Sequence, residues 1–99
     1  MNKPITLNGL QSHIKQTDYR PEHRMRYYLK LVEEVGELAE VIRKDARLEK
    51  NEGRIKGTIE EELCDVLYYV AALANVYDID LEACFEQKDA INKVKWNKW

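Results

Sequence analysis

Apolar residues recur along this chain at the three- and four-residue spacing of amphipathic helices. The first such segment covers residues 7–17, with Thr6 placed to cap it, and residues 18–21 break the pattern. A second and longer segment covers residues 22–48 and is interrupted only by Gly36. The first half of the chain is therefore predicted to form two helices.

The second half repeats this organisation after a polar loop at residues 49–57. Thr58 with Glu61 forms a capping box, which predicts a third helix from Thr58 to about Tyr77. A turn that ends in the capping residue Asp80 leads into a last helix through Trp96. The chain is thus predicted to be an all-α protein, with four helices in a single domain over residues 1–99.

The third predicted helix is apolar on nearly every side, because Asp65 and Asn75 are its only clearly polar side chains between residues 63 and 76. Such a helix must be covered on most sides. Three other helices from a chain of 99 residues cover it poorly. We therefore expect a four-helix bundle completed by homo-oligomerisation, as a homodimer or a homotetramer.

Composition narrows the class of protein without changing this architecture. Charged residues make up 34% of the chain and the formal net charge is −2, a balance that favours neither a nucleic-acid nor a membrane partner. The longest apolar stretch, about residues 66–76, is shorter than the ~20 residues of a membrane span, and residues 1–8 lack a signal-peptide pattern. These features predict a cytoplasmic protein. Cys64 and Cys84 lack metal-binding spacing and are expected to be buried, reduced packing residues.

Two pairs of carboxylates interrupt the apolar pattern, Glu34 with Glu37 and Glu62 with Asp65. Within each pair the residues are three apart, so both side chains leave the same face of a helix. A helical wheel places Glu34 and Glu62 inside the apolar stripes, with no Lys or Arg expected on the same faces. Single pairs of this kind are usually solvated, but two pairs that enter apolar stripes need a neutralising partner. We expect a hard cation, Mg²⁺ or in its place Mn²⁺, that also holds phosphate oxygens.

Other metals fit this pattern less well. Ferritin-type di-iron sites use Glu followed by His three residues later, and zinc favours Cys or His. Neither carboxylate pair has such a partner at the required spacing.

A basic and amide stripe occupies the last predicted helix. Lys88, Asn92 and Lys95 follow Leu81 and Phe85 on one face, so the stripe that should point inward changes from apolar to polar. One interpretation is that the lysines only extend from the edge of the core into solvent. Beside an acidic metal site, Lys88 and Asn92 would instead be placed to bind a phosphate chain.

Together these segments resemble the MazG-like nucleoside triphosphate pyrophosphohydrolases of the all-α NTP pyrophosphatase superfamily. The matching strings are LVEEVGELAE at 31–40, EELCDVL at 61–67 and KDAINKVKW at 88–96. They carry the family's ExxE, ExxD and K-x3-N patterns in order. The resemblance implies a MazG-like helical bundle. It also implies that the residues of these motifs bind metal, act in catalysis or contact the substrate, as they do in the family.

By this resemblance, Mg²⁺ binding and catalysis would fall to Glu34, Glu37, Glu62 and Asp65. Glu37 is preferred over Glu33 as the group that orients or deprotonates the attacking water. Substrate contacts would come from Lys88, Asn92, Tyr69 and Lys95. Related sequences often carry Arg in place of Lys95, and Tyr69 fits ordinary core packing equally well.

The implied reaction is the Mg-dependent hydrolysis of an NTP or dNTP between its α and β phosphates. The products would be NMP and pyrophosphate, in the house-cleaning of nucleotide pools. The alternative is a catalytically silent helical dimer that binds metal or nucleotide and acts through a protein partner. The base is not specified by the sequence, and candidates for a base pocket are His13, Tyr27, Tyr28, Tyr69 and Trp96.

Overall fold

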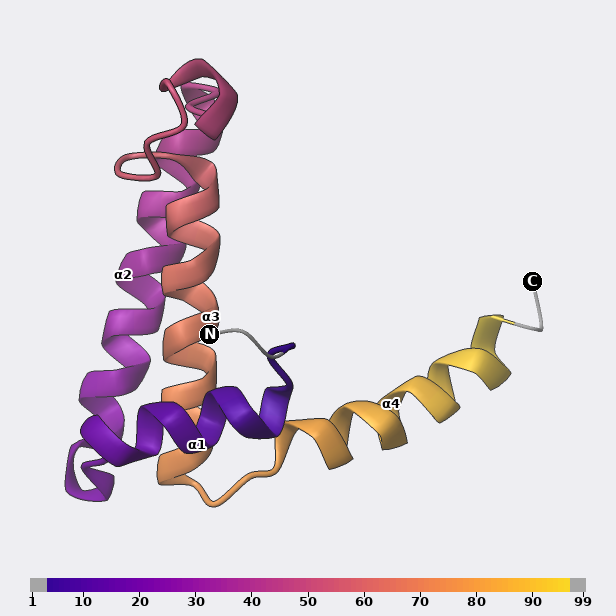
Figure 1. The fold of residues 1–99 in the computed structure, drawn as a ribbon. Helices are drawn as coiled ribbons and strands as arrows, with labels where there is room; N and C mark the ends of the chain where they lie inside the picture. The colour runs from indigo at the N-terminus through magenta and orange to yellow at the C-terminus, as the bar shows by residue number, and fades with distance from the viewer. Residues whose placement is uncertain (1–3, 97–99) are drawn as a thin grey trace.

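The computed structural model describes residues 4–96, and the side-chain surroundings of residues 4–94. Over this range the chain is helical, with four α-helices and two short 3-10 turns (Figure 1). The α-helices are α1 (Leu7–Thr17), α2 (Arg24–Arg43), α3 (Ile59–Val76) and α4 (Leu81–Trp96), and the 3-10 turns are η1 (Pro21–His23) and η2 (Leu48–Lys50). The prediction of an all-α, four-helix chain is confirmed.

Side-chain caps fix the helix starts where the sequence predicts them. Thr6, Thr58 and Asp80 each accept a hydrogen bond from the backbone N–H three residues later, at 2.9, 3.2 and 3.1 Å. The capping box at Thr58 is half formed, because the Glu61 carboxylate accepts from the backbone N–H of Gly57 at 2.9 Å. The start of α3, which carries two of the predicted site residues, is thereby fixed.

The second helix ends at Arg43 and not near Leu48, as the sequence suggested. Asp45 adopts a φ of 53°, in the left-handed region, which interrupts the helical hydrogen bonds. The backbone N–H of Ile59 donates to the carbonyl of Ala46 at 2.7 Å, so the chain turns back directly onto the start of α3. This early ending makes α2 and α3 similar in length and lets them pack side by side.

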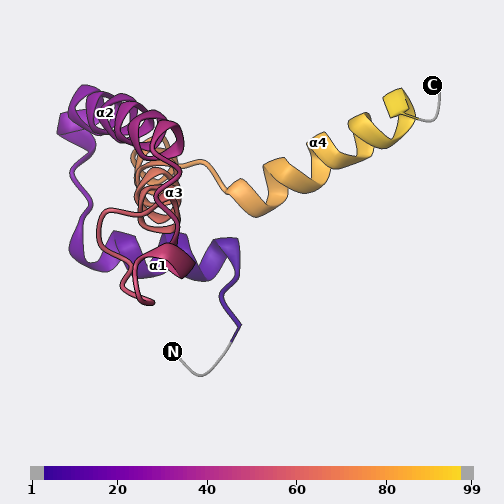
Figure 2. The ribbon, with the colours of Figure 1, turned by 90° about the horizontal axis from the view of Figure 1, so that it is seen from above.

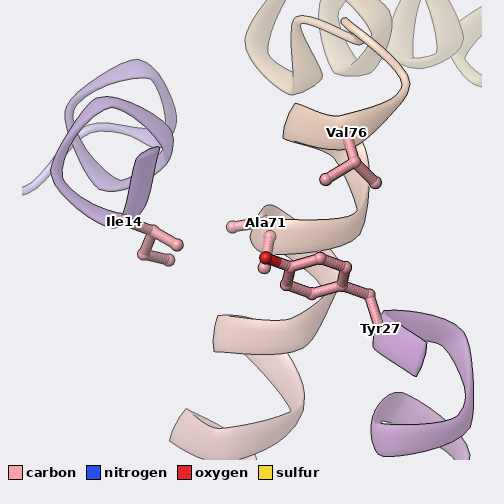
Figure 3. Packing of buried hydrophobic residues seen from close by; sticks show 5 residues of the cluster. Ile14, Tyr27, Ala71 and Val76 are labelled. Atoms are coloured by element: carbon pink, nitrogen blue, oxygen red, sulfur yellow. The ribbon is translucent and has the colours of Figure 1, made fainter. Parts of the chain in front are cut away.

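The core lies where α1 crosses the α2–α3 pair (Figures 1 and 2). Figure 3 shows Ile14 of α1 and Tyr27 of α2 reaching toward Ala71 of α3, with Val76 close to the end of that helix. Ala71 and Ala72 are fully buried. Because these two side chains are small, both neighbouring helices can approach the backbone of α3 closely.

Two groups of polar side chains lock the same junction. Gln11 Nε2 donates to Asn75 Oδ1 at 3.0 Å, and Asn75 Nδ2 donates to the backbone carbonyl of Gln11 at 2.8 Å. The Asp18 carboxylate accepts from the hydroxyls of Tyr27 and Tyr68 at 2.7 and 2.5 Å. Since these polar groups have partners, their hydrogen bonds offset the cost of desolvation, and they position α1 and the start of α2 against α3.

The fourth helix projects away from the other three (Figure 2). Its main packing partner is α1, and Phe85 in its second turn is 66% exposed. The radius of gyration is 15.9 Å, above the roughly 13 Å of a compact chain of this length. The prediction that the apolar stripe of this helix points inward is therefore wrong for the single chain.

Apolar side chains remain exposed on three of the helices. These residues lie on α2, α3 and α4, and include Val32, Val35, Leu63, Leu67, Phe85 and Ile91. Cys64 and Cys84 lie among them as exposed free thiols, so their prediction as buried packing residues is wrong for one copy of the chain. Within the described residues, the helices lack the length and apolar character that a membrane crossing needs. One copy thus leaves apolar helix faces uncovered.

Candidate metal centre

The packing of α2 on α3 brings the two predicted carboxylate pairs together. Carboxylate oxygens of Glu34, Glu62 and Asp65 lie within 4.8 Å of one another. A second group within the same limit consists of Glu33, Glu34 and Glu37, so Glu34 belongs to both. The spacing of three residues gives each helix one acidic face, and the two faces oppose each other. The structure therefore gathers all four predicted ligands and adds Glu33.

Burial divides this acidic cluster into a floor and a rim. Glu34 and Glu62 are 8% and 7% exposed, as the helical wheel predicts, whereas Asp65 is half-buried and Glu37 is exposed. The Oε2 atoms of Glu34 and Glu62 are buried without a hydrogen-bond partner. A buried polar atom left unpaired costs about 1–3 kcal/mol, and more when it is charged. These two oxygens are therefore candidate ligands for a cation.

Burial also raises the pKa of the carboxyl groups of Glu34, Glu62 and Asp65. Burial first, and then the carboxylates of Glu62 and Glu37, raise the pKa of Glu34 to about 7. Burial likewise raises the pKa of Glu62. The pKa of Asp65 is raised by burial and then by the charge of Glu61. A divalent cation would have the opposite effect, because its positive charge stabilises the ionised carboxylates.

One cation lies closer to this site than the sequence led us to expect. Lys30, one helical turn before Glu34, places its Nζ 3.4 Å from Glu33 Oε1 and 5.9 Å from the centre of the Tyr69 ring. Among the residues that the structure describes, no Lys or Arg comes within 4.0 Å of the two buried carboxylates. Lys30 thus borders the cluster without neutralising its floor.

The ligand chemistry fits a hard divalent cation. Both groups of side chains offer carboxylate oxygens alone, and neither contains His or Cys. Oxygen ligands suit Mg²⁺ and Mn²⁺, whereas zinc favours nitrogen and sulfur. The two unpartnered buried oxygens are an independent sign that the cluster can take up positive charge.

The predicted substrate residues are divided between two places. Tyr69 lies on α3 one turn after Asp65, beside the cluster, and is partly buried. Lys88 and Asn92 lie on α4, which projects away from the α2–α3 pair, so they do not join the cluster of their own chain (Figures 1 and 2). The side chain of Lys95 falls outside the described part of the chain.

The candidate base-pocket residues are separated as well. Tyr27 and Tyr69 line one cavity of about 280 Å³, next to the start of α2. His13 and Tyr28 are exposed, and the side chain of Trp96 falls outside the described part of the chain. Sequence reasoning missed the other residues of this cavity, because they come from an irregular segment and one helix face without a motif. They are Asp18, Arg20, His23, Arg26 and Lys30.

Comparisons with known proteins agree with this geometry. The model of the MazG nucleotide pyrophosphohydrolase domain matches residues 22–96, a segment that contains both carboxylate pairs. The Ntag-iMazG crystal structure from Vibrio DAT 722 is 50% identical, with a TM-score of 0.81, over 94% of this chain and 99% of that chain. The Ctag-iMazG structure from the same source is 49% identical, with a TM-score of 0.79, over 90% and 99%. A search of curated proteins found no match.

Proposed function

The chain belongs to the MazG nucleotide pyrophosphohydrolase family, and on that premise we propose that it hydrolyses nucleoside triphosphates at the acidic cluster. The reaction cleaves an NTP or dNTP between the α and β phosphates and releases NMP and pyrophosphate. It removes unwanted nucleotides from the pool. The observation that supports this most directly is the pair of buried, unpartnered carboxylate oxygens on facing helices.

The metal in this proposal is Mg²⁺, with Mn²⁺ as a substitute. Its ligands would be Glu34 and Glu62 from the floor of the cluster and Asp65 and Glu37 from the rim. When bound, the cation supplies Lewis-acid polarisation of phosphate and water and neutralises charge on the triphosphate. The α-phosphate would bind at the open side of the cluster, where Asp65 and Glu37 form the rim.

Glu37 is the proposed general base. It is exposed at the rim, so its carboxylate is accessible to a water molecule. The water oxygen forms the new bond to the α-phosphorus as Glu37 accepts its proton. The bond from the α-phosphorus to the bridging oxygen then breaks, and pyrophosphate leaves with the electron pair. Tyr69 borders the same space and contacts the nucleotide.

The test is pyrophosphate release from a panel of NTPs and dNTPs with Mg²⁺, for the wild type and for Asp65→Asn. We expect pyrophosphate and monophosphate from the wild type, and loss of turnover in the variant with its helical content unchanged by circular dichroism. The matched control is Asp89→Asn, which removes one carboxylate from α4 outside the cluster. Failure of the folded wild type to turn over any nucleotide, while it still binds Mg²⁺, would favour the catalytically silent alternative.

We also propose that the chain acts as a homodimer or homotetramer. Lys88 borders an apolar hollow of about 430 Å³ with Leu67 and Phe85, which a second copy could fill. Because α4 projects from its own chain, Lys88 and Asn92 would then contact phosphate or sugar at the cluster of a neighbouring copy. Light scattering should give a mass of two or four chains, and Phe85→Asp should dissociate the assembly. A fully active monomer would contradict this assembly.

Activity from mixed variants tests the exchange of residues between copies. Glu62→Gln disables the cluster, and Lys88→Gln disables the phosphate contact. If each site combines residues of two copies, mixed oligomers should recover part of the activity that each variant lacks alone. No recovery in verified mixed oligomers would place each complete site within one copy.

A further inference from the structure

The outer face of α2 carries an apolar stripe that the described part of the chain leaves uncovered. Its six residues follow one another at alternating spacings of three and four, the pattern by which two helices interlock in a coiled coil. The five large side chains among them are 48–65% exposed, and Ala39 is exposed as well. This stripe, here called the outer seam, extends about 25 Å along the helix. It consists of Met25, Tyr28, Val32, Val35, Ala39 and Ile42.

The outer seam is separate from the contact that holds α2 in its own chain. The residues of α2 that face α3 each precede a seam residue by one position, so the seam is turned by about 100° from that contact. Tyr27 and Glu34 among them are buried, whereas Tyr28 and Val35, which follow them, are exposed. Figure 2 shows α2 at the edge of the molecule, packed on α3. The seam is therefore free to contact a further helix.

Gly36 gives an independent indication that another helix comes close. It lies in the middle of α2, where glycine lowers the stability of a helix relative to alanine. A Cβ atom here would meet no packed neighbour within 4 Å, so the packing of the chain on itself does not require glycine. Gly36 is exposed and directly follows Val35 of the outer seam. The missing side chain would let the backbone of a second helix approach the seam closely.

The charges beside the outer seam favour an antiparallel partner. One face of α2 carries basic residues toward the start of the helix and acidic residues farther along: Arg26, Lys30, Glu33, Glu37 and Glu40. A two-fold axis perpendicular to two such helices places their charged faces on the same side of the pair, with opposite directions. The basic part of one copy then lies beside the acidic part of the other. Lys30 and Glu40 also contact charges of their own helix, so this complementarity sets the direction of the pair more than its strength.

We propose that α2 pairs with α2 of a second copy of this chain, antiparallel and through the outer seam. The two seams overlap in full when Met25 of one copy lies opposite Ile42 of the other, which places Gly36 within one turn of the two-fold axis. Glu37 lies outside the seam, so the acidic cluster stays open. The contact is separate from the apolar hollow beside α4 and does not rest on the proposed hydrolysis. Together, the two contacts would build a tetramer.

Cross-linking tests the contact and its direction. In a background of Cys64→Ser and Cys84→Ser that keeps the wild-type mass, Met25→Cys and Ile42→Cys are treated with a short bismaleimide. Chains with Met25→Cys and chains with Ile42→Cys should cross-link when they are co-expressed, whereas neither variant should cross-link alone. Co-expression of Met25→Cys with Glu49→Cys is the control, because Glu49 lies in the exposed loop outside the seam. It should give no cross-link.

The mass of the assembly in analytical ultracentrifugation gives a second test. Val32→Glu places a charge in the outer seam and should halve the mass, with helical content unchanged in circular dichroism. Ile55→Glu is the matched control, because both side chains are 49% exposed and Ile55 lies in the loop before α3. It should leave the mass unchanged.

Gly36→Ala separates association from folding. Alanine fits the single chain and favours its helix, so a weaker assembly could not be attributed to unfolding. Because the added methyl group crowds the second helix, the dissociation constant should rise about tenfold, which corresponds to about 1.4 kcal/mol. An unchanged dissociation constant would contradict a close approach at Gly36.

Three further outcomes would overturn the proposal. They are a wild type that is monomeric at all concentrations, cross-linking of Met25→Cys with itself, and a wild-type mass in Val32→Glu. A mass lowered by Phe85→Asp but not by Val32→Glu would keep the α4 contact and reject the α2 contact. Pyrophosphate release is a separate readout. Seam-dependent assembly of an inactive protein would support this contact and reject the proposed hydrolysis, and hydrolysis by a monomeric wild type would do the reverse.

Discussion

The two ends of the α2–α3 pair bury polar side chains to the same extent but treat them differently. At the α1 crossing, Gln11 and Asn75 are 7% and 6% exposed, and at the other end Glu34 and Glu62 are 8% and 7% exposed. The Gln11 amide donates to Asn75 Oδ1 at 3.0 Å, and the Asn75 amide donates to the backbone carbonyl of Gln11 at 2.8 Å. The carboxylates face each other with one oxygen each left unpartnered. Burial alone therefore does not distinguish the two regions, whereas the presence of partners does.

The difference distinguishes buried polar side chains that stabilise the fold from buried polar side chains that serve the function. A satisfied pair of amides fixes one helix arrangement and contributes to the free energy of unfolding. Two close carboxylates without donors lower it, because burial and mutual repulsion both oppose their charge. A pair of buried carboxylates of this kind is expected at a functional site, where a bound ligand supplies positive charge that neutralises them. The comparison predicts opposite responses to mutation at the two ends.

The largest effect is expected from Glu62→Gln. Loss of a metal-binding carboxylate should lower the rate of triphosphate hydrolysis about 10³-fold, or about 4 kcal/mol of transition-state stabilisation. The same change should raise the melting temperature of the metal-free protein, since it removes a buried charge. Glu52→Gln on the exposed loop is the control and should alter neither quantity. A melting temperature that falls in Glu62→Gln would remove the contrast between the two ends.

Asn75→Ala should show the opposite pattern. It leaves the buried Gln11 amide without its partner on α3 and should lower the free energy of unfolding by about 2–3 kcal/mol. Urea denaturation measures this loss. Mg²⁺ affinity, measured well below the unfolding transition, should stay near that of the wild type. Equal losses of stability and of Mg²⁺ affinity would mean that the two ends are coupled.

The metal-free protein should become less stable as the pH rises from about 4.5 to 7. The pKa of Glu34 is raised from 4.5 to about 7 in the folded state, so its contribution to stability is complete below pH 4.5 and is lost as the pH rises through about 7. Each pKa unit is worth about 1.4 kcal/mol. Urea denaturation with a chelator at several pH values measures the slope, and Glu34→Gln should flatten it.

Excess Mg²⁺ provides the complementary measurement. A cation that binds the folded, ionised cluster should restore stability most strongly near pH 7 and little near pH 4.5. Equal stabilisation at both pH values would indicate that the cation binds elsewhere.

The smallest effect is expected from Tyr68→Phe. Its hydroxyl donates to Asp18, which keeps a second donor in Tyr27, so the loss should be about 1 kcal/mol of unfolding free energy. Tyr28→Phe is the control, because that side chain is exposed. Thermal melts of the two variants compare them directly. A larger loss in the control would show that the Asp18 contacts are not what holds this end together.

Local sequence was sufficient for the features that depend on neighbouring residues. The starts of three helices could be predicted because Thr6, Thr58 and Asp80 cap the backbone within their own turn. The end of α2 could not, because it depends on the left-handed conformation of Asp45 and on the contact of Ala46 with Ile59. The contact between Ala46 and Ile59 forms only when the chain turns back and α3 packs along α2.

The candidate site follows the same division. The sequence by itself determined which carboxylates share a helix face, because the helical repeat fixes the direction of residues three apart. Only the tertiary structure decided that Glu34 meets Glu62, that Arg26 lines a cavity with Tyr69, and that α4, which carries Lys88, projects away from the α2–α3 pair. These relations depend on how helices pack and on where α4 leaves the core. Packing of that kind is set by side chains far apart in the chain and not by any local repeat.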